Sequence, residues 1–293
     1  MHADVSNLEE LKRAISNGAE GIGVLRTEFL YGSSDSHSEE YHFQNYREAI
    51  KLADNRPITI RTYCGGAGDP LMGQWGIRHS MANEEQFITQ IRAILRASAY
   101  AHGNNVNIVL PGIADIEEFK WAKDKITTVK NQLKDENQEI SGYVPLGIMI
   151  EIPAVVLSLE MFTHEVNFYL VDSDKLLQYI MAIDTRAPAA PTLNDPMHPA
   201  MLRTLKRIVE CKPGQKLNIS ICGRLAEIEC AIPLFIGLAI RSIAIDPSLI
   251  AKLFNYMNGI DKESSVRIAA KALALSNSDR IKNYVHAAID KLR

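Results

Sequence analysis

Short apolar runs that each stop on a polar residue recur along this chain, and helix-like segments separate them. One run alternates apolar and polar side chains and stops on Cys222, and similar runs stop on Arg26, Arg61 and Glu151. With the runs at 106–111, 166–171 and 242–245, and a very short one at 2–5, the strands number eight. Eight strands separated by helices predict an α/β fold, a single (β/α)8 TIM barrel over residues 1–293. In such a barrel the chemistry sits where the strands end.

Composition and charge narrow the classes of function. The chain has 46% hydrophobic and 23% charged residues, as ordinary globular proteins do, and a net charge of −3. This charge predicts neither a nucleic-acid partner nor binding to an anionic membrane. The longest uncharged apolar run, residues 230–240, is too short to cross a bilayer, and the N-terminus lacks the pattern of a signal peptide. Because the four cysteines show no C-x-x-C spacing, we expect a protein of the reducing cytoplasm.

Capping residues predict where several helices begin. The expected caps are Ser6 with Glu9, Asn83, and Asp115 with Glu118. Each would accept hydrogen bonds from the first N–H groups of a helix, which have no partner within it. These helices fall between the predicted strands, as the barrel requires.

A family resemblance appears at the same strand ends. Residues 18–31 read Gly-Ala-Glu-Gly-Ile-Gly-Val-Leu-Arg-Thr-Glu-Phe-Leu-Tyr, and further matching segments are residues 60–62, 93–98, 147–153, 195–199 and 222–223. In this order they resemble the C-terminal, phosphoenolpyruvate-binding barrel of enzyme I of the bacterial sugar phosphotransferase system, a phosphoenolpyruvate–protein phosphotransferase. The resemblance spans nearly the whole chain. The family's N-terminal phosphohistidine domain has no counterpart in it.

The resemblance implies roles for four strand-end residues. Arg26 and Arg61 correspond to arginines that hold the phosphate of phosphoenolpyruvate, and guanidinium groups suit that task because they bind phosphate oxygens in pairs. Glu151 corresponds to a magnesium ligand, and Cys222 to the donor that protonates the enolate as pyruvate forms. Read without the resemblance, the arginines would pair with a carboxylate such as Glu28, Glu151 would end a strand in water, and Cys222 would be an inert buried thiol.

The sequence departs from the family's pattern in the ligand shell. The aspartate that completes the magnesium site falls on Lys175, and a protonated ammonium cannot ligate a metal. The neighbouring asparagine falls on Asp174, which takes its substrate-binding position. A further phosphate-binding arginine is displaced by one residue, to Arg186. Other departures are Trp75 in place of an arginine, Arg224 in place of a glutamate, and a shortened loop at 64–73 that lacks the family's lysine.

We therefore expect a barrel that binds phosphoenolpyruvate or a pyruvate-like anion and has weakened or lost phosphoryl transfer. Mg²⁺ is the cofactor if the site survives; otherwise Lys175 supplies the positive charge, paired with Glu151, and no metal is needed. The resemblance implies a homodimer and a phosphohistidine domain or carrier protein as partner. A non-catalytic, regulatory or anion-sensing dimeric paralogue is the alternative. A weaker one is a metal-dependent carbon–carbon lyase of the same superfamily.

Overall fold

The computed structural model describes residues 1–32, 38–65, 73–101, 105–183, 193–211 and 217–292. Its strands are β1 (His2–Val5), β2 (Ile22–Leu25), β3 (Ile58–Arg61), β4 (Val106–Leu110), β5 (Leu146–Ile150), β6 (Phe168–Asp172), β7 (Ile219–Cys222) and β8 (Ser242–Ile245). They form a closed barrel in chain order, and every neighbouring pair is parallel. The very short β1 pairs with both β2 and β8 and so closes the ring. The predicted (β/α)8 barrel is confirmed.

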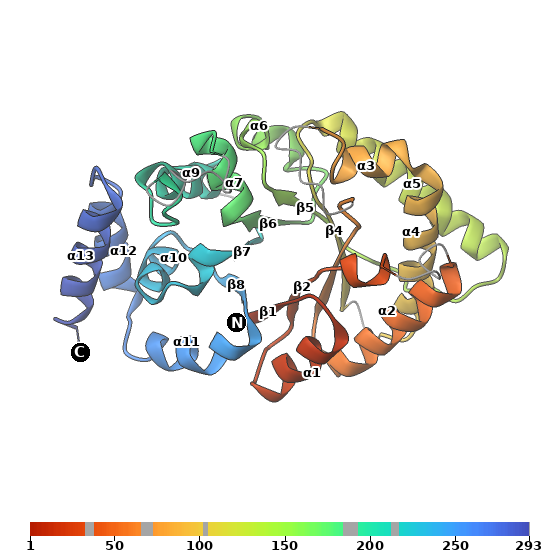
Figure 1. Cartoon of the computed structure of the whole chain (residues 1–293), viewed down its shortest axis with the longest axis horizontal. Coiled ribbons are helices and arrows are strands. Elements are labelled where there is room, and N and C mark those ends of the chain that lie inside the picture. Colours follow the sequence, from red (N-terminus) through yellow and green to blue (C-terminus); the bar gives the residue numbers. More distant parts are fainter. Residues whose placement is uncertain (33–37, 66–72, 102–104, 184–192, 212–216, 293) are drawn as a thin grey trace.

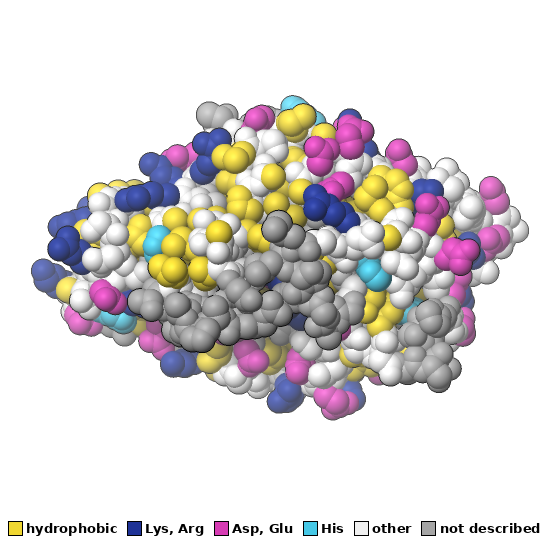
Figure 2. Space-filling view, turned by 45° about the horizontal axis from the view of Figure 1, so that its top comes forward, with side chains coloured by type: hydrophobic (Ala, Val, Ile, Leu, Met, Phe, Trp, Pro, Cys, Tyr) yellow, Lys and Arg dark blue, Asp and Glu magenta, His cyan; other side chains and the backbone are white. Residues whose placement is uncertain are grey.

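Helices surround the barrel, as Figure 1 shows. They are α1 (Leu8–Ser16), α2 (Glu39–Ala53), α3 (Ile77–Ala82), α4 (Glu84–Ser98), α5 (Ile116–Asp135), α6 (Pro153–Leu157), α7 (Ser173–Met181), α9 (Pro199–Glu210), α10 (Ile232–Gly237), α11 (Ile250–Met257), α12 (Lys262–Ala272) and α13 (Ser278–Ile289). Short 3-10 turns are η1 (Glu28–Leu30), η2 (Leu159–Phe162), η3 (Arg224–Glu227), η4 (Glu229–Ala231) and η5 (Pro247–Leu249). Acidic, basic and apolar side chains are interspersed over the face shown in Figure 2.

The structure confirms the predicted helix caps only in part. Asp115 and Glu118 form the predicted capping box of α5. At α1 the cap is Asn7 rather than Ser6: the Asn7 side chain accepts from the Glu10 N–H, and the Glu10 carboxylate accepts from the Ser6 N–H. The prediction was one residue early because Ser and Asn cap equally well. Asn83 stands at the start of α4 but caps nothing, since its amide donates back to the His79 carbonyl.

Two separate sets of apolar side chains fill the molecule. Most buried side chains form the layer between the strands and the helices. A smaller cluster lies inside the barrel and consists of Val24, Val109, Met149, Leu170, Cys222 and Ala244. Because side chains alternate along a strand, residues two positions further along these strands also face the barrel axis. This alternation brings polar side chains to the carboxyl-end mouth of the barrel.

Candidate functional site

The four residues assigned by resemblance lie together at the mouth of the barrel. Arg26 and Glu151 follow the interior residues Val24 and Met149 by two positions, and Cys222 is itself part of the interior cluster. Arg61 ends β3. The charges of Arg26 and Glu151 affect the pKa values of both the Cys222 thiol and the Arg61 guanidinium. Four strands therefore converge on one polar site.

Arg26 is held by a carboxylate from the neighbouring strand. Its Nε and Nη2 atoms donate to the two oxygens of Asp4 at 2.7 and 2.6 Å. The pairing with Asp4 raises the pKa of Arg26, so the guanidinium stays charged. A two-point contact of this kind fixes the plane of the guanidinium.

Arg61 is more deeply buried, with 6% of its surface exposed. Its Nη2 donates to Glu28 at 2.6 Å, which is the carboxylate pairing that the arginine would have without any ligand. Its Nε is buried and has no hydrogen-bond partner among the described residues, and neither does the second oxygen of Glu28. Buried polar atoms without partners are rare in native proteins, so both atoms are suited to contacting a bound polar ligand.

Glu151 is almost fully buried, and one of its oxygens accepts from the Gly112 N–H at 2.6 Å. Burial and the nearby charge of Asp172 raise the pKa of Glu151 from 4.5 to about 8. The Gly112 amide is placed by a close crossing of two chain segments. Gly112 and Gly76 both have positive φ, and a Cβ on Gly76 would lie 2.6 Å from the Pro111 carbonyl oxygen.

This raised pKa predicts how stability depends on pH. In metal-free protein with EDTA, the free energy of unfolding should fall by on the order of 2–4 kcal/mol as the pH rises from about 4.5 to 8. In this pH range Glu151 is protonated in the folded state but ionised in the unfolded state, so raising the pH favours unfolding. Urea unfolding at a series of pH values measures it. Glu151→Gln, which keeps an acceptor for Gly112, should flatten the decline, whereas Glu165→Gln at a half-exposed site should not. An unchanged slope in Glu151→Gln would contradict the assignment.

Asp172 is a site residue that the sequence reasoning missed. It ends β6 and is 5% exposed; burial is the main cause of its raised pKa. One of its oxygens caps α7 by accepting from the N–H groups of Asp174 and Lys175 at 3.0 and 3.1 Å. Its position in the sequence could have identified it. Like Arg61, Glu151 and Cys222, Asp172 is the polar residue at the end of an apolar strand.

Asp174 and Lys175 make contacts that differ from the expectations. Asp174 accepts from the backbone N–H and the side chain of Arg224, so its carboxylate is already paired. Lys175 and Glu151 form no ion pair, although both are described; the Lys175 ammonium lies 5.3 Å from the centre of the Trp75 ring. The expected direct ion pair of Lys175 with Glu151 is therefore not formed, although the charge of Lys175 still acts on Glu151 and lowers its pKa. Arg186 lies outside the described residues.

Cys222 is completely buried, and burial raises the pKa of its thiol well above 9.0. The acidic neighbours Asp172 and Asp4 act in the same direction. A thiol in this environment keeps its proton at neutral pH. It is therefore suited to donating a proton and poorly suited to acting as a thiolate nucleophile.

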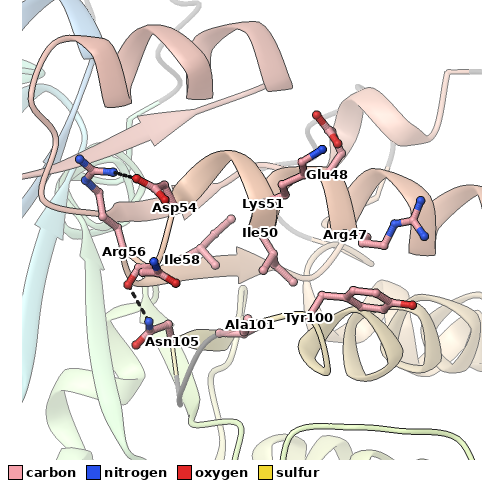
Figure 3. Close-up of a pocket in the computed structure, with 12 residues that line it drawn as sticks. Arg47, Glu48, Ile50, Lys51, Asp54, Arg56, Ile58, Tyr100, Ala101 and Asn105 are labelled. Carbon is pink, nitrogen blue, oxygen red and sulfur yellow. Dashed lines mark hydrogen bonds and ion pairs between the residues drawn. The ribbon is translucent and has the colours of Figure 1, made fainter.

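A separate pocket of about 410 Å³ lies at the opposite end of the barrel, where Ile58 begins β3 and Val106 begins β4 (Figure 3). Arg47 lies over the Tyr100 ring at 5.5 Å in its wall. None of the residues assigned by resemblance lines this pocket. It belongs to the face of a TIM barrel on which catalytic residues are not expected.

Within the described part of the chain, the side chains that could hold a metal ion are a few buried carboxylates. The described residues contain no group of three or more His, Cys, Asp or Glu side chains that could hold a metal ion. Mg²⁺, however, is usually held by one or two protein carboxylates together with water and substrate oxygens. The buried carboxylates at the mouth fit that requirement. Separately, no described helix is long and apolar enough to cross a membrane.

Comparisons with known proteins agree on one family. The family described as "PEP-utilising enzyme, PEP-binding domain" matches residues 1–261. Phosphoenolpyruvate-protein phosphotransferase of Staphylococcus aureus (strain MSSA476) is 33% identical over 300 residues, which cover 97% of this chain and 52% of that protein. The Listeria monocytogenes (strain EGD-e) protein of the same name is 33% identical over 292 residues, covering 95% and 50%. The chain thus spans about half the length of these relatives.

Solved structures share the fold at much lower identity. The Haloferax volcanii malate synthase pyruvate/acetyl-CoA ternary complex matches with a TM-score of 0.54 and 12% identity, over 95% of this chain and 76% of that one. At this identity the match shows the barrel fold alone.

Proposed function

This chain belongs to the family of PEP-binding domains of PEP-utilising enzymes, and we propose that the mouth of its barrel binds phosphoenolpyruvate or a pyruvate-like anion. The observation that carries the proposal is the convergence of Arg26, Arg61, Glu151 and Cys222 at one mouth from four different strands. Arg61 supports it further, because its buried Nε has no hydrogen-bond partner among the described residues and suits a phosphate or carboxylate oxygen.

Each residue has a distinct task in this proposal. The guanidinium groups of Arg26 and Arg61 bind and orient the anion in a site from which water is largely excluded. Glu151 is the residue that would hold Mg²⁺, which when bound stabilises the charge on the transferring phosphoryl group. The protonated thiol of Cys222 holds a proton for C3 of the enolate that remains when the phosphoryl group leaves, which yields pyruvate.

We propose that phosphoryl transfer is slower here than in the relatives. Both arginines already carry a carboxylate partner, Asp4 or Glu28, with which a substrate must compete. The position of the metal-completing aspartate holds Lys175, which has no lone pair for a metal. Since every ~1.4 kcal/mol of lost transition-state stabilisation slows a reaction tenfold, weaker metal and substrate contacts lower the rate steeply.

The remaining expectations stand as parts of the same proposal. The phosphoryl acceptor is a phosphohistidine domain or carrier protein, the protein acts as a homodimer, and it works in the cytoplasm. A non-catalytic, anion-sensing role is the second candidate, and the partnered arginines favour it. The lyase alternative has only the shared fold in its support and needs a metal held by acidic ligands as well.

Calorimetry tests binding directly. Oxalate, pyruvate, phosphoenolpyruvate and phosphate are titrated into the protein with Mg²⁺ and with EDTA, and at least one carboxylate ligand is expected to bind at millimolar concentration. Absence of binding for all four under both conditions would overturn the proposal. Adding a phosphohistidine domain of a relative then separates the two candidates: labelled phosphate reaches the histidine if the barrel is catalytic and does not if it is a sensor.

A further inference from the structure

Two buried carboxylates stand side by side at the mouth of the barrel. β5 and β6 pair in parallel with Ile150 opposite Val171, and Glu151 and Asp172 are the next residue on each strand. Neighbouring strands lie about 4.8 Å apart, so both side chains leave adjacent backbone positions toward the barrel axis. Glu151 is 1% and Asp172 is 5% exposed.

In each of these carboxylates, one oxygen accepts hydrogen bonds from backbone N–H groups. One oxygen of Glu151 accepts from the Gly112 N–H, and one oxygen of Asp172 accepts from the first N–H groups of α7. The second oxygen of each accepts no hydrogen bond from any residue that the structure describes. Two anionic groups buried together are costly unless a cation or proton lies between them.

Arg61 adds an independent sign of a ligand. Its charge acts on both Glu151 and Asp172, and its buried Nε lacks a partner among the described residues. A guanidinium N–H without a described partner suits an anionic oxygen, while two adjacent buried carboxylates suit a cation. A metal ion and an anion bound together would satisfy both sets of atoms.

We propose that Asp172 replaces the missing carboxylate at position 175 and forms, with Glu151, a site for a divalent cation such as Mg²⁺ or Mn²⁺. The inference rests on the proposed function, because the cation would be shared with the bound anion. The Lys175 ammonium does not fill this place by pairing with Glu151; it lies over Trp75. In the family's pattern, position 172 is a glycine. The proposed carboxylate ligand therefore lies three residues earlier in the chain, at the end of β6 instead of in the first turn of α7.

Mn²⁺ binding, measured from the electron paramagnetic resonance signal of the free ion, tests the inference without any assay of activity. Mn²⁺ is titrated alone and with oxalate into wild-type protein, Asp172→Asn and Asp261→Asn. Loss of one carboxylate ligand should weaken Mn²⁺ binding about tenfold or more in Asp172→Asn. Asparagine still caps α7, so the helix is preserved. Asp261 also caps a helix, α12, by accepting from the Ser264 N–H, but it is exposed and is not among the residues at the mouth, so Asp261→Asn should bind Mn²⁺ as the wild type does.

Each outcome of the Mn²⁺ and anion titrations either supports the proposed cation site or overturns it. Equal Mn²⁺ affinity of Asp172→Asn and wild type would overturn the inference and leave Asp172 as a helix cap only. Absence of Mn²⁺ binding to the wild type, while oxalate still binds in EDTA, would overturn the inference and leave the proposed function intact. Failure of oxalate and the other anions to bind under any condition would remove both. Asp172→Ser, which also keeps a cap, replaces Asp172→Asn if circular dichroism shows that the latter is unfolded.

Discussion

Replacing Arg61 by lysine should weaken the binding of oxalate or phosphoenolpyruvate by about 10- to 100-fold. A hydrogen bond to a charged group contributes roughly 1.5–3 kcal/mol, and each 1.4 kcal/mol is about tenfold in affinity. Lysine keeps the positive charge beside Glu28 but lacks the Nε, which has no partner among the residues that the structure describes. The loss should therefore fall on ligand affinity, with a smaller effect on folding than removal of the charge would have.

Titration calorimetry of the wild type, Arg61→Lys and Arg78→Lys measures this effect. Arg78 is the matched control, because it also donates to a glutamate, Glu118, at 2.7 Å, but is half-exposed on α3. Its replacement should leave anion affinity unchanged. Unaltered binding by Arg61→Lys would mean that the anion does not contact the guanidinium, and the assignment of the phosphate position would fail.

Replacing Gly76 by alanine should lower the free energy of unfolding by about 2–5 kcal/mol. Two effects add: a non-glycine residue at positive φ costs roughly 1–3 kcal/mol, and forcing a methyl group into a packed site costs a further 1–3. Gly76 has φ of +59°, and an added Cβ would meet the backbone of Pro111 and Gly112 rather than a side chain that can turn away. Because Gly112 donates to Glu151, anion binding should weaken as well.

Gly18→Ala separates the two effects. Gly18 also has positive φ, +86°, but no atom lies within 4 Å of its Cβ position. Its replacement should cost only the conformational strain, about 1–2 kcal/mol, and should leave anion affinity unchanged. Urea unfolding and calorimetry on both variants provide the comparison. Equal losses of stability in the two variants would show that the crossing at Gly76 and Gly112 tolerates a side chain.

Local patterns were sufficient for the strands and for the residues that end them. Arg61, Glu151 and Cys222 could be placed at one mouth from sequence because parallel strands in a closed barrel end at the same edge and alternate their side chains. Helix starts were less certain. Ser6 and Asn7 are both good caps, and the choice between them depends on which backbone geometry the preceding strand permits.

The order of polar strand ends is written in the chain, and it was enough to predict the barrel and the position of the mouth, while the family came from the resemblance of longer segments. The partners of those residues are not. Asp4 reaches Arg26 across 22 residues, Glu28 reaches Arg61 across 33, and Gly112 reaches Glu151 across 39. These contacts, and the adjacency of Asp172 to Glu151, exist only once the barrel closes in one register. Periodicity sets the direction of a side chain along its own strand, whereas closure sets which side chains meet.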